Sequence, residues 1–401
     1  MKSYIDLEES LNILDSNVKN NKIEKVGILQ GLKRIIAQDV LSKINNPPFN
    51  KSAMDGYAIN KDFNKECKNE FEIIGEVFAG ETFDKELDKN QCIKIMTGAP
   101  IPKGANAVVK KEDVGIEDNK IKCIKPININ ENICFIGEDI KENQILIKKG
   151  KKLDYADIGI LASSGINEVF VYTKPQIGFL STGDEVIDID ENLQEGKIYN
   201  SNKYSIISRI MELGYEVNYV EHIKDDYKFI GQKIKELSKD VDLIITTGGA
   251  SVGDKDLLKD AITYINGEKL FWKINIKPGS AVLASKYNDT TIISLSGNPT
   301  AALTTFELLV KPTIEKLNGK EHIVIHKEKA ILVDDFNKKS KNKRFVRGKC
   351  FFEDGKQYVR ITQVKSGNGI LSSSLNSNCL IEIKKDSNGL NKGEIIDIIK
   401  L

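Results

Sequence analysis

The chain has 401 residues, which suggests two to four domains of ordinary size. Hydrophobic residues make up 40% and charged residues 29%, so the composition excludes a disordered or collagen-like chain. The 59 basic and 58 acidic residues nearly cancel, which argues against a protein dedicated to nucleic acid or to a membrane surface. No apolar run reaches the roughly 18–20 residues of a membrane span, and the first residues lack a signal-peptide pattern. We therefore expect a cytoplasmic, multidomain protein.

The N-terminal half combines helices with many short strands. Apolar residues recur at helical spacing over residues 5–18, which predicts an amphipathic helix. From about 44 to 150, short β-like runs alternate with glycine, proline and asparagine, which is typical of a β-rich module with ordered loops. A second helix is predicted over residues 153–166.

The C-terminal half begins with alternating strands and helices. This rhythm, over residues 175–317, predicts a doubly wound α/β domain whose ligand lies at the carboxyl ends of the strands. The last predicted helix, 299–317, has Pro299 in its first turn. After residue 322 only strand patterns remain, which predicts a β-barrel-like terminal domain. The predicted boundaries are 1–43 with 136–174 for an N-terminal helical and linking domain, 44–135 for an inserted β-rich module, 175–318 for the α/β domain and 319–401 for the barrel-like domain.

A glycine-rich loop follows the predicted strand 241–247. Its glycines, among them Gly248, Gly249 and Gly253, could turn backbone N–H groups toward an anion at the start of a helix. Asp254 stands where a Walker A loop requires lysine, so a kinase-type phosphate cradle is disfavoured. The acidic end of the loop, at Asp256, suits a divalent cation or a ligand with hydroxyl and amine donors, although this residue alone could simply cap its helix.

Other turns of the same domain should converge on this loop. Thr182, Gly183 and Glu185 follow the first strand, Asp225 and Asp226 precede a helix, and the last strand ends at Ser296-Gly297-Asn298-Pro299. Parallel strands end at one edge of a sheet, so Glu185, one of the two aspartates and Asp256 should lie near each other. Several carboxylates around glycine-rich turns indicate a magnesium and phosphate site.

Basic residues could complete such a site. Lys273 and Lys277, in the segment Trp272–Gly279, share one face at spacing i, i+4 if the segment is extended. The two cations would then let the site hold both a metal and an oxyanion. No histidine is placed beside a serine or cysteine in a readable motif, so acyl-transfer chemistry has no support.

Three motifs of the N-terminal half form a second cluster. They are PPFNKSAMDGYA with Asp55, IMTGAPIP with Thr97, and GEDI with Asp139. Turn chemistry alone would explain each of them.

Seven motifs in order resemble the molybdopterin molybdenumtransferases of the MoeA type, a family that includes the C-terminal domain of gephyrin. They are PPFNKSAMDGYA, IMTGAPIPKGANAVV, GEDI, STGDEV, TTGGASVGDKD, KINIKPG and SGNPTAA. The resemblance implies insertion of molybdenum from molybdate into adenylylated molybdopterin, with Mg²⁺ and release of AMP. It also implies a homodimer whose active cleft lies between the α/β domain of one subunit and the β module of the other. Transient contact with the upstream adenylyltransferase and with apo-molybdoenzymes is a possible further implication, whereas nucleic acid and membrane are not expected partners.

The matched positions give the candidate site. The expected catalytic residues are Asp55, Asp139, Glu185, Asp226 (with Asp225 as the alternative), Asp256, Lys273 and Lys277, and the expected metal ligands are Glu185 and Asp256. The expected ligand-binding residues are Thr97, Thr182, Gly183, Gly248, Gly249, Ser251, Gly253, Pro278, Gly297, Asn298 and Pro299. A serine of the barrel-like domain, among Ser372 to Ser374, lies near a further family position.

Departures from the family pattern leave several points open. Ser296 replaces a usual proline, Ala250 replaces a common valine, and an arginine often found shortly before GEDI is absent, with residues 134–136 in its place. An adenylyltransferase acting one step upstream, a gephyrin-like scaffold and a tungsten-specific enzyme are the alternatives. Retention of the acidic and basic site residues argues against a pure scaffold.

Overall fold

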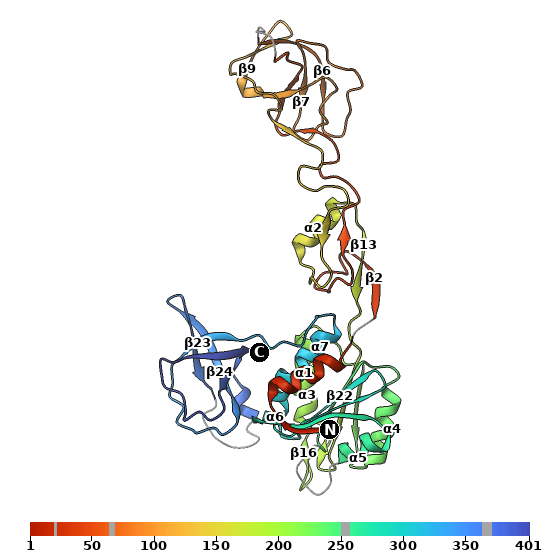
Figure 1. Ribbon diagram of the computed structural model, residues 1–401, viewed down its shortest axis with the longest axis vertical. Coiled ribbons are helices and arrows are strands. Elements are labelled where there is room, and N and C mark those ends of the chain that lie inside the picture. The colour runs from red at the N-terminus through yellow and green to blue at the C-terminus, as the bar shows by residue number, and fades with distance from the viewer. Residues whose placement is uncertain (20–21, 64–68, 250–256, 363–370) are drawn as a thin grey trace. The chain divides into compact units, whose positions relative to one another are not determined.

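The computed structural model describes residues 1–19, 22–63, 69–249, 257–362 and 371–401. The chain forms two compact units, which we describe separately (Figure 1). The first unit contains Met1–Ile23 and Tyr172–Leu401, and the second contains Glu24–Val171. Among the residues that the structure describes, no helix has the length and apolar character needed to cross a membrane.

A seven-stranded sheet organises the α/β part of the first unit. Its strand order is β1-β19-β21-β22-β18-β14-β17, and β14 lies parallel to both of its neighbours, β17 and β18, as β18 does to β22. The strands are β1 Lys2–Ile5, β14 Ile177–Thr182, β17 Tyr219–Ile223, β18 Leu243–Thr247, β19 Glu268–Ile274, β21 Leu283–Tyr287 and β22 Thr290–Leu295. Strand β1 was not expected: four N-terminal residues extend the sheet beside β19. Only β21 runs against its neighbours, so the carboxyl ends of the other strands share one edge.

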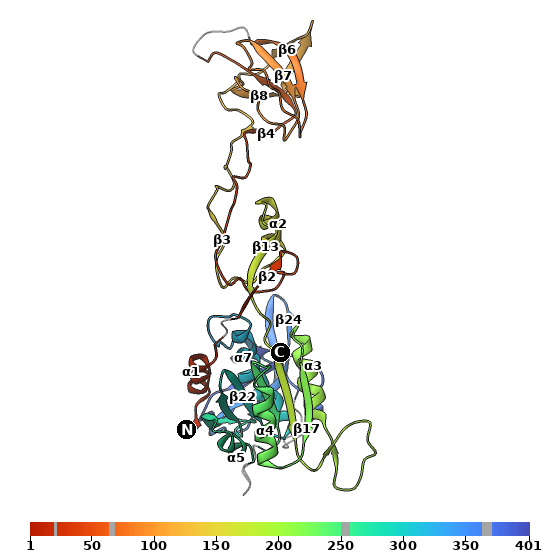
Figure 2. The same ribbon diagram turned by 90° about the vertical axis from the view of Figure 1, so that its right-hand side faces the viewer.

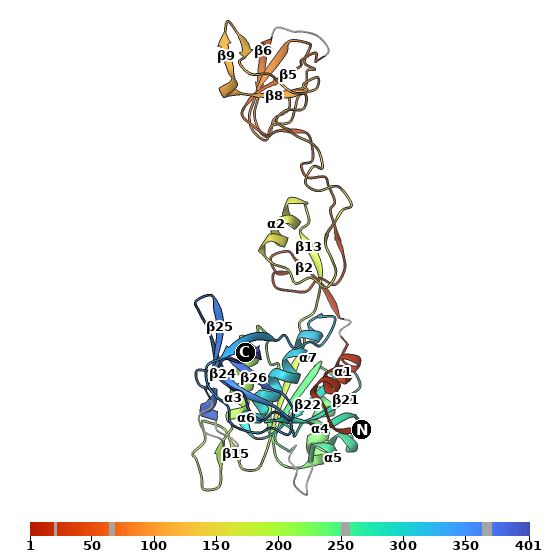
Figure 3. The same ribbon diagram turned by 60° about the vertical axis from the view of Figure 1, so that its left-hand side comes forward.

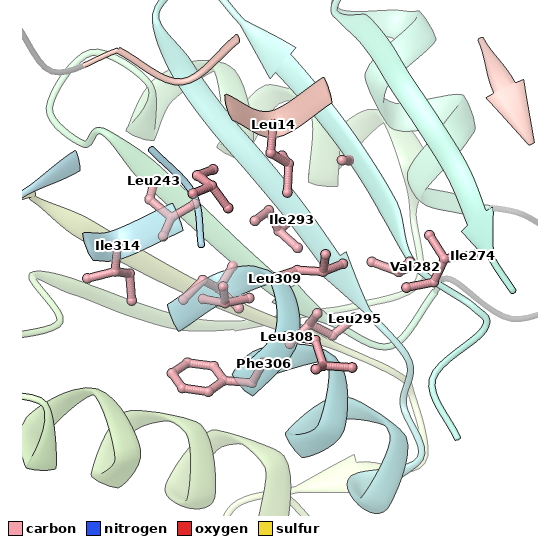
Figure 4. Close-up of a cluster of buried hydrophobic side chains, with 14 of the residues drawn as sticks. Leu14, Leu243, Ile274, Val282, Ile293, Leu295, Phe306, Leu308, Leu309 and Ile314 are labelled. Atoms are coloured by element: carbon pink, nitrogen blue, oxygen red, sulfur yellow. The ribbon is translucent and has the colours of Figure 1, made fainter. Parts of the chain in front are cut away.

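Helices cover both faces of this sheet. Their bounds are α1 Leu7–Asn17, α3 Ser201–Glu212, α4 Tyr227–Leu237, α5 Leu257–Tyr264, α6 Pro299–Thr305 and α7 Lys311–Leu317, with a π-helical turn, η2 Phe306–Val310, between the last two. Helices α1 and α7 contact each other on one face (Figure 2). Leu14, Ile293 and Phe306 pack together in the core of that face (Figure 4). The opposite face is covered by α4 and α5, whose apolar residues pack on Ile244 and Ile292.

Alternation along the strands explains the two layers. Ile245 and Ile293 face the first core, whereas their neighbours Ile244 and Ile292 face the second, as expected when successive side chains point to opposite faces. The expected doubly wound α/β/α domain is confirmed.

The rest of the first unit is a closed barrel-like sheet (Figure 3). Its strand order is β20-β24-β25-β23-β27-β26, and an additional pairing of β24 with β26 closes the ring. The strands are β20 Ile276–Lys277, β23 Glu328–Leu332, β24 Lys343–Glu353, β25 Lys356–Ile361, β26 Cys379–Ile383 and β27 Ile395–Lys400. A short 3-10 helix, η3 Leu371–Ser374, precedes β26. Closure satisfies the edges of the sheet and confirms the barrel-like prediction.

The second unit consists mainly of β structure. A six-stranded sheet has the order β8-β5-β7-β6-β10-β9, and the remaining strands form two-stranded pairs. The sheet strands are β5 Gly56–Ile59, β6 Glu70–Val77, β7 Gln91–Ile95, β8 Ala107–Lys110, β9 Val114–Glu117 and β10 Lys120–Cys123. The other elements are β2 Ile23–Gly27, β3 Val40–Leu41, β4 Lys51–Ser52, β11 Ile133–Cys134, β12 Ile145–Ile147, β13 Glu168–Tyr172, α2 Tyr155–Ser163 and the 3-10 turn η1 Lys111–Asp113. A parallel two-stranded pair, β15 Val186–Ile187 with β16 Ile198–Tyr199, belongs to the first unit.

Candidate active site

Three turns of the α/β domain meet where their strands end. Gly248, directly after β18, has a φ of +91°, and a Cβ added to it would lie 2.4 Å from the carbonyl oxygen of Thr182 at the end of β14. A Cβ added to Gly297, after β22, would lie 3.6 Å from the Cα of Gly248. Glycine adopts such a φ without strain and leaves room for this approach, whereas a side chain at position 248 would force the turns apart.

Buried polar atoms at these turns have no partner among the residues that the structure describes. Thr182 Oγ1 and Asn202 Oδ1 belong to side chains that are 3% and 8% exposed, and neither atom is hydrogen-bonded within the described ranges. Asn202, in α3, is fixed at the site because its Nδ2 donates to Gly297 O at 2.8 Å. An unpaired buried polar atom destabilises a protein, so a polar ligand at these turns would supply the missing bonds.

The turn before α6 is held by its own side chains. Ser296 Oγ accepts a hydrogen bond from Asn298 N at 3.2 Å, and Asn298 Oδ1 caps α6 by accepting from Ala301 N at 3.3 Å. Pro299 is the first helical residue. The hydrogen bond that Ser296 Oγ accepts thus stabilises the turn at the position where the family usually has a second proline.

Acidic side chains gather beside the first of these turns. A Cβ added to Gly183 would lie 2.9 Å from both carboxylate oxygens of Glu185, so this carboxylate lies over the turn. The backbone N–H of Asp225 donates to Asp184 Oδ1 at 3.4 Å. Desolvation and the negative charges of Asp184 and Glu185 raise the pKa of Asp225, although the residue as a whole is exposed.

Asp226 has a different role from its neighbour. Its Oδ1 accepts from the backbone N–H groups of Lys228 at 2.8 Å and Phe229 at 2.9 Å, so Asp226 is the N-cap of α4. We expected Asp226 as the catalytic aspartate and Asp225 as the alternative. Which of the two acts at the site stays a prediction: Asp225 lies near the charges of Asp184 and Glu185, whereas Asp226 caps its helix.

The expected metal site stays a prediction. Within the described ranges, no group of three or more histidine, cysteine, aspartate or glutamate side chains is arranged to hold a metal ion. Glu185 is described, but its expected partner Asp256 lies outside the described residues, as do Ser251 and Gly253 of the same loop.

Lys273 and Lys277 do not share a face of one strand. The chain leaves the α/β sheet at Ile274 and enters the barrel-like sheet at Ile276, and Lys273 has a φ of +62°, which breaks the regular alternation. Lys273 is 5% exposed, and its Nζ donates to Tyr4 Oη at 3.1 Å and lies 3.8 Å from the centroid of the Trp272 ring. The expectation of an i, i+4 pair on an extended segment is therefore wrong.

Lys277 lies instead where the barrel-like domain joins the α/β domain. It is exposed and pairs in register with Arg344 of β24. A Cβ added to Gly279, two residues later, would lie 2.6 Å from Thr305 Cγ2, so the segment containing Pro278 packs closely against α6.

In the second unit the structure brings Asp55 and Thr97 together. Asp55 Oδ1 accepts from both Thr97 N and Thr97 Oγ1 at 2.8 Å, and these bonds, helped by the charge of Lys111, lower the pKa of Asp55. Asp139 lies on a segment that pairs with residues 46–47, and its Oδ2 accepts from Asn46 Nδ2 at 3.2 Å. The two aspartates thus occupy separate hydrogen-bonded positions of this unit.

Two features of the first unit have no clear signal in the sequence. Arg347 of β24 is 6% exposed; its Nε has no partner among the described residues, and burial lowers its pKa. Only five of the 59 basic residues are arginine, which is a weak indication that Arg347 has a particular role. His222 Nδ1 lies 3.0 Å from Ser181 Oγ, a contact between residues 41 positions apart that no sequence motif indicates. Ser181 is buried and also accepts from Asn200, so this pair links β14 to β17, whereas His222 itself is exposed.

The fold and these turns define a multidomain protein built around a molybdopterin-binding type of α/β domain. Family models match in chain order: the MoeA N-terminal region (domain I and II) at residues 5–165, a probable molybdopterin binding domain at 178–316 and the MoeA C-terminal region (domain IV) at 329–401.

Relatives match over the whole chain. A molybdopterin molybdenumtransferase of Staphylococcus aureus (strain COL) is 33% identical over 405 residues, covering 99% of this chain and 96% of the relative. Two crystal structures of the MoeA protein of Pyrococcus horikoshii have TM-scores of 0.84 and 0.80, with 29% and 31% identity. Each covers 99% of this chain, and this chain covers 99% and 100% of them. The chain therefore belongs to the molybdopterin molybdenumtransferase family, an enzyme family of molybdenum cofactor biosynthesis, as its motifs predicted.

Proposed function

We propose that the protein inserts molybdenum from molybdate into adenylylated molybdopterin, in a Mg²⁺-dependent reaction that releases AMP. The observation that carries the proposal is the meeting of three glycine turns at one sheet edge, with buried polar atoms that have no partner among the described residues beside an acidic group. Such an edge is where open α/β sheets bind their ligands.

The turns would bind the pterin substrate. Thr182 Oγ1 can donate and Asn202 Oδ1 can accept a hydrogen bond, which suits a ring system that carries both acceptors and amine donors. Gly248 and Gly249, with φ of +91° and +64°, present backbone without side chains. This allows close approach of a phosphate-bearing ligand.

The acidic group fits Mg²⁺ held together with substrate. Glu185 and Asp225 offer carboxylate oxygens, and the raised pKa of Asp225 reflects repulsion that a cation would relieve. Mg²⁺ is commonly bound by one or two carboxylates, substrate phosphates and water, which does not require a cage of three protein ligands. When bound, the ion would neutralise charge on the phosphoanhydride. The protein's own contribution is to hold the pterin and the oxyanion in line.

Three cations of the first unit are the candidates to hold molybdate. Lys273 is a buried ammonium, Lys277 is exposed beside Arg344, and Arg347 has an unpaired buried Nε within the described ranges. A tetrahedral dianion would satisfy such desolvated cations. No protein nucleophile is needed for this reaction.

The facing half of the site would come from a second subunit. We propose that the chain acts as a homodimer in which Asp55, Thr97 and Asp139 of one subunit complete the cleft of the other. Support comes from the Asp55–Thr97 pair, whose exposed carboxylate is held charged by two donors and so is ready to accept hydrogen bonds from a ligand.

Substrate choice tests this function. The purified protein should convert adenylylated molybdopterin and molybdate to AMP and molybdenum cofactor, and should not consume ATP with molybdopterin. Lys277→Ala should raise the molybdate requirement roughly 10–150-fold, the usual effect of losing one charge-assisted contact. Its requirement for the pterin should stay nearly unchanged. Lys239→Ala is the control, because Lys239 is an exposed lysine before the amino end of β18, whereas the turns follow the carboxyl end of that strand. Consumption of ATP in place of the adenylylated pterin would favour the upstream step, and running the assay with tungstate settles the choice of metal.

A further inference from the structure

We propose that Tyr4, from the N-terminal strand, is a positioning residue for Lys273. This inference rests on the proposed role of Lys273 in binding the oxyanion. Its basis is a direct contact between two residues separated by almost 270 positions: Lys273 Nζ donates to Tyr4 Oη at 3.1 Å.

The N-terminal strand is docked firmly enough to position a side chain. Strand β1 pairs in parallel with β19, with Ser3 opposite Trp272 and Ile5 opposite Ile274. Asn275 strengthens this contact, because its backbone N–H donates to Ile5 O at 2.8 Å and its Nδ2 donates to Tyr4 O at 2.5 Å. The backbone of Tyr4 is thus bound to the residues that surround Lys273.

Both members of the pair have unusual backbone conformations. Tyr4 has a φ of +55° and Lys273 a φ of +62°, a region that side chains other than glycine rarely adopt. In a regular strand Trp272 and Lys273 would point to opposite faces, yet Lys273 Nζ lies 3.8 Å from the centroid of the Trp272 ring. Strained backbone persists only where the surrounding structure enforces it, and it concentrates at functional sites.

Among the residues that the structure describes, no carboxylate pairs with the ammonium of Lys273. The described contacts of Lys273 Nζ are the Tyr4 hydroxyl, the Trp272 ring and the Tyr4 ring, whose centroid is 5.1 Å away. Each is a neutral group that stabilises a cation without neutralising it. The hydroxyl of Tyr4 accepts from Lys273, so its own proton can be donated to the same bound anion. Tyr4 therefore keeps Lys273 oriented and ready for an oxyanion.

The alternative is that Tyr4 only covers the edge of the sheet. Tyr4→Phe separates the two, because it keeps the ring and removes the hydroxyl. We expect the molybdate concentration for half-maximal rate to rise about 10-fold, the effect of losing one hydrogen bond to a charged group, with little change in kcat. Tyr264→Phe is the control: Tyr264 is another exposed tyrosine of the same domain, whose hydroxyl accepts from Gln232 Nε2 at 3.5 Å.

A double-mutant cycle decides whether Tyr4 acts through Lys273. Tyr4→Phe should have little further effect in a Lys273→Met background, whereas a purely structural contribution would be the same in both backgrounds. Trp272 is the sole tryptophan of the chain, so its emission reports on the two ammonium groups beside its ring, those of Lys273 and Lys259. Titration with sodium molybdate should change the emission at lower concentration in the wild type than in Tyr4→Phe.

The outcomes separate the inference from the proposed function. If Lys273→Met leaves the molybdate requirement unchanged, the proposed role of Lys273 fails and the inference fails with it. If Lys273→Met raises the requirement but Tyr4→Phe behaves as wild type, or if the two effects simply add, only the role of Tyr4 is overturned.

Discussion

Asp225, which is exposed, and Asp55, which is half-buried, both lie close to a strand, yet their surroundings shift their pKa in opposite directions. Desolvation and the carboxylates of Asp184 and Glu185 raise the pKa of Asp225. Two hydrogen bonds from Thr97 lower the pKa of Asp55. The first group accumulates negative charge that an added cation would relieve, whereas the second is held charged by two protein donors and can still accept further hydrogen bonds. The α/β edge is therefore suited to a metal with its phosphate ligand, and the Asp55–Thr97 pair to a ligand that donates hydrogen bonds.

The largest expected effect tests whether both regions serve one site across a dimer. Asp55→Ala and Glu185→Ala chains should each be nearly inactive, and mixing them after dissociation should restore activity. Random reassortment makes about half of the dimers hybrid, with one of two sites intact, so about a quarter of wild-type activity is expected. Activity of the mixture is measured with adenylylated pterin and molybdate.

A matched mixture gives the control for complementation. Asp55→Ala combined with Thr97→Ala should restore nothing, because both changes affect the same half of each site. A wild-type protein that sediments as a monomer at micromolar concentration, or equal recovery in both mixtures, contradicts the dimer.

A smaller effect should separate the two adjacent aspartates. Asp225→Asn and Glu185→Gln should raise the Mg²⁺ concentration for half-maximal rate at least about 10-fold, with partial rescue by excess metal, because each removes a charged ligand. Asp226→Asn should have the smaller effect, because asparagine also caps a helix well. The measurement is the rate against titrated Mg²⁺. Equal, unrescued losses in all three variants would mean that these residues only stabilise their turns.

The sequence predicted the elements of the fold better than the contacts of the site. Strand and helix periodicity was sufficient to predict the α/β domain, because its buried parallel strands are short apolar runs. Pro299 indicated where α6 begins. Strand β1 could not be predicted, since four mostly exposed residues gain their structure only by pairing with β19.

The site shows the same limit at the level of side chains. Glycine-rich turns at strand ends predicted the meeting of Thr182, Gly248 and Gly297, because parallel strands end at one edge. The spacing of Lys273 and Lys277 led to the wrong prediction of a shared face. Lys273, near the end of β19, has a positive φ, and the chain changes sheets between β19 and β20. Sequence spacing carries no information on either event.

The smallest expected effect tests the opposite pKa shifts themselves, through the pH dependence of stability. A carboxyl group whose folded pKa is raised destabilises the fold once it ionises, so Asp225 contributes a penalty that grows as pH rises above its ordinary value of 3.8. Asp225→Asn should therefore raise the free energy of unfolding near neutral pH by less than about 1 kcal/mol, because solvent screens the exposed charges, and the melting temperature should rise with it. This gain should shrink as pH falls toward about 4.5. Asp55 has a folded pKa below its ordinary 3.8, so its contribution is complete above that value and is lost only at lower pH. Asp55→Asn should consequently lower the melting temperature, and this loss should not change with pH between about 4.5 and neutral pH. Thermal denaturation of both variants and the wild type at several pH values measures these two pH dependences. A stability gain from Asp225→Asn that does not depend on pH would show that its carboxylate is not repelled by Asp184 and Glu185.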